Sequence, residues 1–386
     1  MKLLEYKARE LFDKYGIPVM PASLVSDAGH VKARVDEENL SFPVVLKAQV
    51  PIGGRGKAGG IQFCENEQQA YEKAKTLLNS RIGGLVVRQL LVTQAADIEK
   101  ECYLSIMLDR DGKSPILIFS SSGGIEIEET AKTDPGKITR MAIDPQLGVS
   151  LQDIHYILDK NCMDETLLHD LHQIAGRLYL LCTEYHCLLA EINPLAIVKN
   201  GGFVALDGKI DIDDSALYLL PDIQEYKALT DIDNHPLVVE AEKHGFLYIP
   251  VSDSGNVVVM SNGSGMLMNC IDMLSETGTP VSAAVDLGGG AAAERIREAV
   301  RILLKTPNTN AMFISVFGGL TRCDEVAKGL KAGLADSGLE LDIVIRLEGT
   351  NRAQGVSILK EIPERLHLVD WPQEGVRILE MRGASR

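Results

Sequence analysis

The chain of 386 residues contains no apolar run of the roughly 18–20 residues that a membrane-spanning helix needs. It also has no basic excess, because its formal net charge is −15, and this argues against a nucleic-acid or anionic-membrane surface. The first residues carry an acid at Glu5 and no apolar core, which argues against a secretory signal. We therefore expect a cytoplasmic protein whose partners include neither nucleic acid nor membrane.

Paired cysteines and a built-in nucleophile are missing as well. The seven cysteines include no Cys-x-x-Cys pair, and no histidine pair joins them at zinc-finger spacing. We therefore expect reduced thiols that pack as small apolar residues. No Gly-x-Ser-x-Gly elbow occurs, and the eight histidines lie outside the glycine-rich loops. If the reaction needs a covalent relay, that residue must come from another chain.

The carboxyl half repeats an apolar run, a glycine turn and an amphipathic helix. Its apolar runs span residues 257–260, 281–287, 311–317 and 343–347, and glycines follow each of them. Such runs predict the buried parallel strands of a doubly wound α/β sheet, which binds ligands at the carboxyl ends of its strands.

The amino half predicts an α+β domain instead. It has an amphipathic helix over residues 1–15 and hairpin signals at residues 109–112 and 200–202. The polar stretch 231–236 predicts the join, which divides the chain into domains 1–236 and 237–386.

A strand with Lys47 near its end leads into residues 53–60, a loop with five glycines and the cations Arg55 and Lys57. Bare main-chain amides and two cations are suited to wrapping a polyphosphate. Gly54-x-Gly56-x-x-Gly59 also matches the dinucleotide fingerprint, but residues 61–63 predict a strand where that motif requires a helix. The alternative is a flexible surface loop with ordinary cations.

A second constellation lies on either side of the turn at residues 200–202. A hairpin there brings Asn193 and Asp207 within a residue or two of register, and Glu191 shares a strand face with Asn193. Carboxylate and amide oxygens suit magnesium, which takes few protein ligands besides substrate phosphates. The alternative is a hairpin with polar residues facing solvent.

Two loops of the carboxyl half form the third constellation. Residues 317–324 precede a helix through Val326, Leu330 and Leu334, and residues 262–265 form a similar turn one strand away. Open amides at a helix start hold a carboxylate or phosphate, although a single glycine turn is usually only a turn.

Taken in order, these segments resemble the β subunits of the succinate–CoA ligase family over essentially the whole chain. The matching stretches are Lys47-Ala48-Gln49-Val50 with residues 53–60, Ala190-Glu191-Ile192-Asn193-Pro194-Leu195, Leu206-Asp207-Gly208-Lys209, Asp286-Leu287-Gly288-Gly289-Gly290-Ala291, Phe317-Gly318-Gly319 with Arg322-Cys323-Asp324, and Arg346-Leu347-Glu348-Gly349. The resemblance implies an amino-terminal ATP-grasp domain and a flavodoxin-like carboxyl domain.

The resemblance also implies roles for individual residues and for a partner. The α subunit would supply a histidine that the nucleotide phosphorylates, together with most of the CoA site. That histidine would pass its phosphate to a small dicarboxylic acid, CoA would displace the phosphate, and Glu191 would position the imidazole. The implied contacts are Lys47, Gly54, Arg55, Gly56, Glu101 and the hinge around Thr93 and Ala96 for ATP or GTP, Asn193 and Asp207 for Mg²⁺, and Asn262, Gly319, Leu320 and Thr321 for the acid or phosphate.

Three positions depart from the family pattern. The family usually has a carboxylate where this chain reads Val92-Thr93-Gln94, and many relatives have histidine and a small residue at Pro51-Ile52. Thr321 adds a hydroxyl where some relatives are apolar, which leaves malate or another dicarboxylate open as the acid. The altered hinge also leaves open a non-catalytic regulatory subunit that responds to nucleotide or CoA. The sequence decides neither ATP against GTP nor an αβ against an α2β2 complex.

Overall fold

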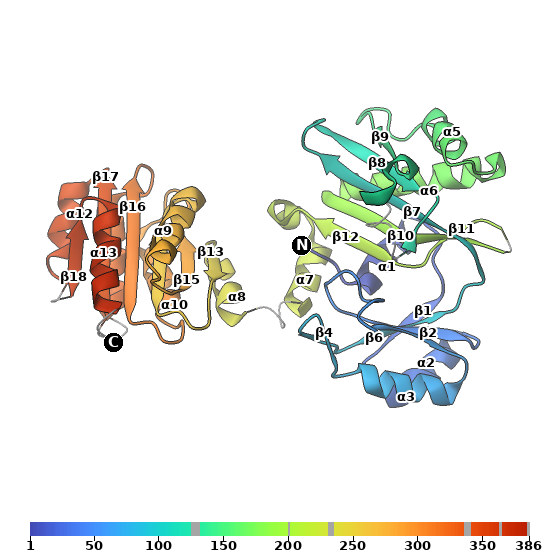
Figure 1. Cartoon of the computed structure of the whole chain (residues 1–386), viewed down its shortest axis with the longest axis horizontal. Coiled ribbons are helices and arrows are strands. Elements are labelled where there is room, and N and C mark those ends of the chain that lie inside the picture. The colour runs from blue at the N-terminus through green and yellow to red at the C-terminus, as the bar shows by residue number, and fades with distance from the viewer. Residues whose placement is uncertain (125–131, 200, 231–234, 336–340, 363–364, 384–386) are drawn as a thin grey trace. The chain divides into compact units, whose positions relative to one another are not determined.

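The computed structural model describes residues 1–124, 132–199, 201–230, 235–335, 341–362 and 365–383. The chain folds into two compact units, Met1–Lys227 and Ala228–Arg386 (Figure 1). The boundary predicted from the sequence, after residue 236, lies later in the chain than this division after Lys227. Residues 231–234 of the predicted join lie outside the described residues. The exact domain limits therefore stay a prediction.

The first unit contains a small antiparallel sheet in the order β1-β6-β2-β3. Helices α2 and α3 pack against it, and α3 begins after Asn66, whose side chain accepts a hydrogen bond from the Gln69 N–H. The elements are β1 (Ala22–Val25), α2 (Val31–Glu37), β2 (Val44–Ala48), β3 (Ile61–Cys64), α3 (Glu67–Leu77) and β6 (Leu90–Gln94), with a short ribbon of β4 (Arg81–Ile82) and β5 (Leu85–Val86).

A larger antiparallel sheet completes the first unit. Its order is β11-β10-β7-β8-β9, and β12 also pairs with β10. The strands are β7 (Ile98–Asp109), β8 (Ser114–Ser120), β9 (Thr139–Ala142), β10 (Cys187–Val198), β11 (Phe203–Ala205) and β12 (Gly208–Ile212). The hairpin predicted at residues 109–112 is confirmed, since it joins β7 to β8. Asn200 of the other predicted turn lies outside the described residues, but β10 and β11 pair antiparallel on either side of it.

Helices cover one face of this larger sheet. The core beneath them combines Leu104 and Phe119 from the strands with Leu178 from α6 and Phe12 from α1. Besides α2 and α3, the described helices of the unit are α1 (Glu5–Lys14), α5 (Leu151–Lys160), α6 (Leu168–Glu184) and α7 (Pro221–Thr230), with 3-10 turns at Ala28–His30, Pro135–Lys137, Glu165–Leu167 and Asp214–Leu219. Because this face is covered, the polar residues of the strands gather on the opposite face.

The amino-terminal helix lies close to β12. The sequence predicts an apolar face of Leu4, Ala8, Leu11 and Phe12; the last three are buried, whereas Leu4 caps the helix, which begins at Glu5. A Cβ added at Gly208 would lie 2.3 Å from the Phe12 ring, so only glycine allows this approach. The close packing brings the first residue of the helix, Glu5, next to the strand that follows Asp207.

The second unit is a doubly wound sheet, as predicted. Its strand order is β13-β15-β14-β16-β17-β18, and all neighbours pair parallel except the edge strand β13. The parallel strands therefore follow the flavodoxin-like order 2-1-3-4-5. They are β14 (Val257–Ser261), β15 (Val281–Asp286), β16 (Ala311–Gly318), β17 (Asp342–Gly349) and β18 (Leu366–Val369), beside β13 (Leu247–Pro250).

Helices pack on both faces of this sheet, as Figure 1 shows in its yellow-to-red portion. One apolar core joins the sheet to α8, α10, α11 and α12, and the other joins it to α9 and α13. The helices are α8 (Pro236–Lys243), α9 (Ser264–Glu276), α10 (Ala293–Leu303), α11 (Cys323–Ala335), α12 (Arg352–Leu359) and α13 (Pro372–Gly383). Burial on both faces explains why the strands have continuous apolar sequences.

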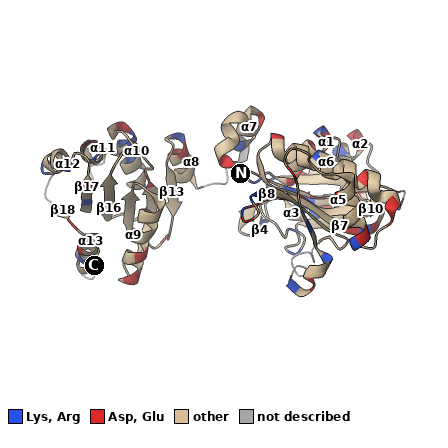
Figure 2. Ribbon diagram, turned by 90° about the horizontal axis from the view of Figure 1, so that it is seen from above, with Lys and Arg blue, Asp and Glu red and all other residues tan. Residues whose placement is uncertain are grey.

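Acidic and basic residues occur in both units (Figure 2). Within the ranges that the structure describes, no helix combines the length and the apolar character needed to span a membrane.

Candidate functional site

The glycine-rich loop returns the chain from β2 to β3. Its base is closed by hydrogen bonds from the Gly60 N–H to the Arg55 carbonyl and from the Ala48 N–H to the Gly60 carbonyl, both at 2.8 Å. Gly54 and Gly59 have φ angles of 73° and 76°, which side chains rarely adopt. A strand and not a helix follows at Ile61, as predicted, so the match to the dinucleotide fingerprint is only formal.

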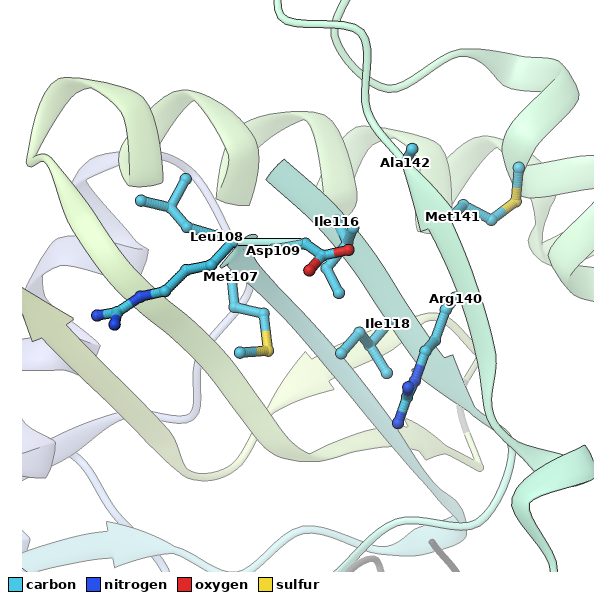
Figure 3. A pocket seen from close by; sticks show the side chains of 9 residues that line it. Met107, Leu108, Asp109, Ile116, Ile118, Arg140, Met141 and Ala142 are labelled. Atoms are coloured by element: carbon cyan, nitrogen blue, oxygen red, sulfur yellow. The ribbon is translucent and has the colours of Figure 1, made fainter. Parts of the chain in front are cut away.

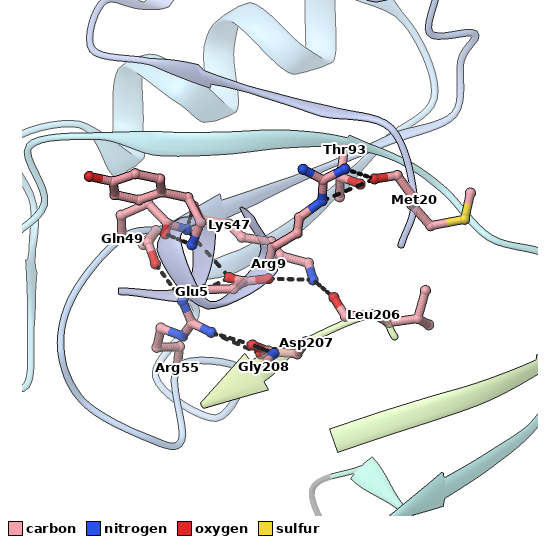
Figure 4. A network of polar contacts seen from close by, with 12 residues as sticks. Glu5, Arg9, Met20, Lys47, Gln49, Arg55, Thr93, Leu206, Asp207 and Gly208 are labelled. Atoms are coloured by element: carbon pink, nitrogen blue, oxygen red, sulfur yellow. Dashed lines mark hydrogen bonds and ion pairs between the residues drawn. The ribbon is translucent and has the colours of Figure 1, made fainter. Parts of the chain in front are cut away.

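The side chains of Lys47 and Arg55 turn inward from this loop and strand (Figure 4). Lys47 Nζ lies 2.8 Å from Glu5 Oε1, and Arg55 Nη1 lies 2.8 Å from Glu5 Oε2. Arg55 Nη2 reaches Asp207 at 2.8 Å from Oδ1 and 2.9 Å from Oδ2. Two cations and two carboxylates from α1, β2, the glycine loop and the start of β12 thus form one buried network.

The network sets the protonation of its carboxyl groups. Burial raises the pKa of Glu5, but the nearby Lys47 and Arg55 outweigh it and bring that pKa below its ordinary value. Burial first, and then the charge of Glu5, raise the pKa of Asp207 to about 6 despite the opposing cations. Two carboxyl groups thus face two cationic side chains in this network.

Asn193 and Asp207 lie side by side, as the hairpin predicted. The Asn193 N–H donates to the Asp207 carbonyl at 3.1 Å. The Asn193 side chain holds Gly124, accepting from its N–H at 2.6 Å and donating to its carbonyl at 3.1 Å. Glu101 is close to the same glycine, since a Cβ there would lie 2.4 Å from Glu101 Oε2. Two residues predicted for separate roles therefore meet at Gly124.

Glu191 lies on the open face of the larger sheet. The Tyr103 hydroxyl donates to Glu191 Oε2 at 3.1 Å, and Lys209 and Ser105 stand opposite Glu191 on the strands at either side. Burial and the Glu191 charge together raise the pKa of Tyr103, so it remains a donor at physiological pH. The carboxylate is thus held from one side and half-exposed on the other.

Thr93 and Ala96, the two residues predicted for the nucleotide hinge, differ in their place relative to β6. Thr93 lies in the middle of the small sheet, opposite Ala22 and Val45, and its hydroxyl donates to the Pro21 carbonyl at 3.0 Å. Ala96 follows the end of β6 and precedes β7. Because Thr93 is paired with both neighbouring strands and its hydroxyl is bonded to Pro21, Ala96 is the better position for main-chain contacts to a ligand.

A cavity of about 600 Å³ lies over β7, β8 and β9 (Figure 3). Its lining includes Met107, Ile116, Ile118 and Arg140, and none of the predicted site residues. Strand register places it on the same face as Glu191, because Ser105 stands opposite Glu191 and Ile118 stands opposite Ser105. The open face therefore changes from polar to apolar across the sheet.

In the second unit, the predicted residues gather at the carboxyl ends of the neighbouring strands β14 and β16. The Asn262 side chain ties the end of β14 to β16, donating to the Phe317 carbonyl at 2.8 Å and accepting from its N–H at 3.0 Å. Thr321 is buried, and its hydroxyl accepts from the Gly290 N–H at 2.9 Å and donates to the Gly288 carbonyl at 3.2 Å. Its single proton is therefore committed to the glycine turn after β15.

The tip of the loop after β16 faces solvent. Gly319 is exposed and Leu320 is 86% exposed, so this loop offers main-chain groups and an apolar side chain at the surface. The start of α11 beyond it has its own acid, Asp324, which accepts from Asn351, Arg322 and Lys328. Asn351 above all, with the two cations, lowers the pKa of Asp324 to about 2. The predicted anion site at this helix start therefore already contains a carboxylate.

The sequence interpretation missed Glu5 and Tyr103. A signal existed for Glu5, since an acid at this position shares a helical face with Ala8 and Phe12 and is drawn into the core with them. Nothing in the sequence pattern marks Tyr103, because only the pairing of β7 with β10 brings it to Glu191.

The chain is similar to known proteins over nearly its whole length. A family model for the ATP-grasp domain matches residues 2–197, and one for CoA-ligase matches residues 260–364. The β subunit of the GDP-forming succinate–CoA ligase of Thermus thermophilus is 38% identical over 94% of each chain. An ADP-forming counterpart from Archaeoglobus fulgidus, succinate–CoA ligase subunit beta 2, is 38% identical over 97% of each.

A solved structure supports the same fold at lower identity. ATP citrate lyase from Methanothrix soehngenii, in complex with citrate and coenzyme A, superposes with a TM-score of 0.78, an identity of 18% and a coverage of 99% of both chains. The two family models, the relatives above 30% identity and the ordered motifs of both units agree. The chain belongs to the family of succinate–CoA ligase β subunits.

Proposed function

We propose that this chain is the nucleotide-binding β subunit of a succinate–CoA ligase, which couples a nucleoside triphosphate to thioester formation. The observation that carries the proposal is the charged network of Lys47, Arg55 and Asp207 in the same unit as the half-exposed Glu191. A non-catalytic regulatory subunit would not need all of these side chains.

The nucleotide would lie against the glycine loop and the open face of the larger sheet. Main-chain amides at Gly54 and Gly56 and the cations Lys47 and Arg55 supply donors for phosphate oxygens. Glu101 and the main chain at Ala96 are suited to the nucleoside end. ATP and GTP have the same triphosphate, which the loop amides and the two cations would contact, so both are candidate substrates.

Asn193 and Asp207 fit a magnesium ion. Both offer hard oxygen ligands from neighbouring main-chain segments, and Mg²⁺ usually adds waters and substrate phosphates to one or two protein ligands. Bound there, the ion would neutralise charge on the nucleotide phosphates. Asp207 is then shared between the metal and Arg55, whose guanidinium has a second carboxylate partner in Glu5.

The covalent step needs a partner chain, and we propose the α subunit in that role. The terminal phosphoryl group would pass from the nucleotide to a nitrogen of the partner's histidine, and then to a carboxylate oxygen of succinate. The CoA thiol would attack that acyl phosphate, forming the thioester and releasing inorganic phosphate. Glu191, held by Tyr103, would accept a hydrogen bond from the imidazole and fix its orientation.

The second unit is proposed to bind the acid, or the phosphate in transit, at Asn262 and the loop Gly319, Leu320 and Thr321. The Thr321 hydroxyl donates its proton within the protein, so it has none for a hydroxylated acid. This observation favours succinate over malate.

Co-expression with the α-type subunit tests the proposal. ADP or GDP release would be followed with CoA and, in turn, succinate, malate and citrate. We expect turnover that depends on succinate and on CoA. A stable complex that binds nucleotide but turns over none of the three acids would overturn the proposal.

A further inference from the structure

Among the described residues of the first unit, Glu5 has the least exposed carboxylate side chain. Its side chain is 2% exposed, and both of its oxygens contact cations. Gln49 adds a hydrogen bond to Oε2 at 3.3 Å and in turn accepts from the Tyr6 N–H at 3.0 Å. The carboxylate thereby joins α1 to a later part of the chain, namely β2 and the glycine loop that follows it (Figure 4).

A helix-capping role does not account for this geometry. An acid in the first turn is favourable near the positive end of a helix even when its side chain faces solvent. Glu10, beyond the first turn of the same helix, is exposed and pairs with Lys7 at 3.0 Å. The Glu5 side chain instead turns into the protein, where an unpaired carboxylate would be strongly unfavourable.

The two partners of Glu5 are the two cations proposed to meet the nucleotide. Lys47 has Glu5 Oε1 and the Leu206 carbonyl as partners, and Arg55 has Glu5 Oε2, Asp207 and the Ala48 carbonyl. When a metal takes Asp207, Glu5 is the carboxylate that remains to hold the guanidinium.

We propose that Glu5 is a positioning residue of the nucleotide site, which fixes Lys47 and Arg55 for phosphoryl transfer and retains Arg55 when Asp207 binds the metal. The inference rests on the proposed function. It adds a residue that touches neither nucleotide nor acid and acts through the two cations. Small displacements of such groups from productive geometry cost about 100-fold in rate.

Steady-state kinetics of the complex with its α subunit test the inference. Glu5→Gln keeps the size of the side chain and removes its charge. We expect kcat to fall about 100-fold, while the KM values for succinate and CoA change less than about threefold. Glu10→Gln, on the same helix, is the matched control and should retain wild-type kcat. A wild-type kcat in Glu5→Gln would overturn the inference and leave the proposed function standing.

A purely structural role for Glu5 gives different results in two further measurements. In a Lys47→Met background, Glu5→Gln should lower kcat by a much smaller factor than it does in the wild type, because part of its effect on kcat is exerted through Lys47. Hydrogen exchange of residues 53–60 without nucleotide should be faster in Glu5→Gln than in Glu10→Gln, since Arg55 loses one anchor. The positioning role would be contradicted if the effects of Glu5→Gln and Lys47→Met on kcat were additive and hydrogen exchange of residues 53–60 were unchanged.

A second variant, Glu5→Asp, tests the inference even if Glu5→Gln does not fold. Glu5→Asp keeps the charge but shortens the reach, so its unfolding temperature should stay near that of the wild type while kcat falls about tenfold. A wild-type kcat in a folded Glu5→Asp would count against the inference. If the wild-type complex itself has no turnover on any acid, the proposed function fails and the inference falls with it.

Discussion

One nitrogen of Arg55 covers both oxygens of Asp207, with Nη2 lying 2.8 Å from Oδ1 and 2.9 Å from Oδ2. The proposed metal ligand is therefore already neutralised by a cation from the glycine loop. A magnesium nucleotide bound as proposed would compete with Arg55 for Asp207, which would link the position of the glycine loop to metal binding.

Replacing Asp207 by asparagine tests its proposed role as a metal ligand. We expect kcat of the complex to fall about 100-fold and the half-saturating Mg²⁺ concentration to rise, because one charged ligand is lost. Asp211→Asn is the control, since Asp211 lies on β12, the strand directly after Asp207, and pairs with the amino terminus at 3.2 Å. Equal Mg²⁺ dependence in the two variants would argue against Asp207 as a ligand.

Tyr103→Phe removes the hydrogen bond to Glu191 and keeps the ring. A hydrogen bond to a charged group contributes about 1.5 kcal/mol, so we expect roughly a tenfold fall in kcat with little change in the nucleotide KM. Tyr179→Phe is the matched control, because the Tyr179 hydroxyl points to the Pro145 carbonyl. An unchanged kcat in Tyr103→Phe would show that Glu191 is oriented without it.

Thr321→Val tests the hydroxyl that spans the glycine turn. The substitution leaves the Gly290 N–H and the Gly288 carbonyl without this partner, and we expect it to lower the free energy of unfolding by about 1–3 kcal/mol. Thr321→Ser keeps the hydroxyl and should lower the free energy of unfolding by less than Thr321→Val does. Urea unfolding measures both variants, and equal losses would mean that the methyl group and not the hydroxyl matters.

Asp324 predicts a pH dependence of stability. Its folded-state pKa of about 2 lies below the ordinary 3.8, so its charged form stabilises the fold above pH 3.8, and this contribution is lost as the pH falls toward 2. Because water screens the surrounding network, we expect about 1 kcal/mol at pH 7 relative to Asp324→Asn.

Urea midpoints of the wild type and Asp324→Asn at several pH values check this expectation. The difference in urea midpoint between the wild type and Asp324→Asn should become smaller below pH 3.8. Asp272→Asn, at an exposed position, should have the same urea midpoint as the wild type at each pH. A gap that stays constant with pH would contradict the account of Asp324.

The sequence predicted most of the architecture because the signals are local. The apolar runs before the glycines of the second unit became its parallel strands, and the turn after Asp109 became a hairpin. The pairing of Asn193 with Asp207 followed from counting residues on either side of a turn. Each of these features depends on neighbours within one segment.

Features that depend on distant segments could not be predicted in the same way. Arg55 appeared in the sequence as a loop cation without a protein partner, whereas the fold pairs it with Glu5 and Asp207. Thr321 appeared as a hydroxyl beside a pocket, whereas it spans Gly288 and Gly290. In both cases, a polar side chain found partners that become neighbours only when separate strands and helices pack together.

Phosphate transfer to the partner chain tests the central claim most directly. The complex would be mixed with nucleotide labelled in its terminal phosphate, without acid or CoA, and the phosphorylated histidine would be quantified over time. The account predicts acid-labile label on the α subunit in the wild type and in the exposed-residue control Glu165→Gln, and a rate at least about 100-fold lower in Glu191→Gln. Label that never reaches the α subunit, or that reaches it at the wild-type rate in Glu191→Gln, would contradict the account.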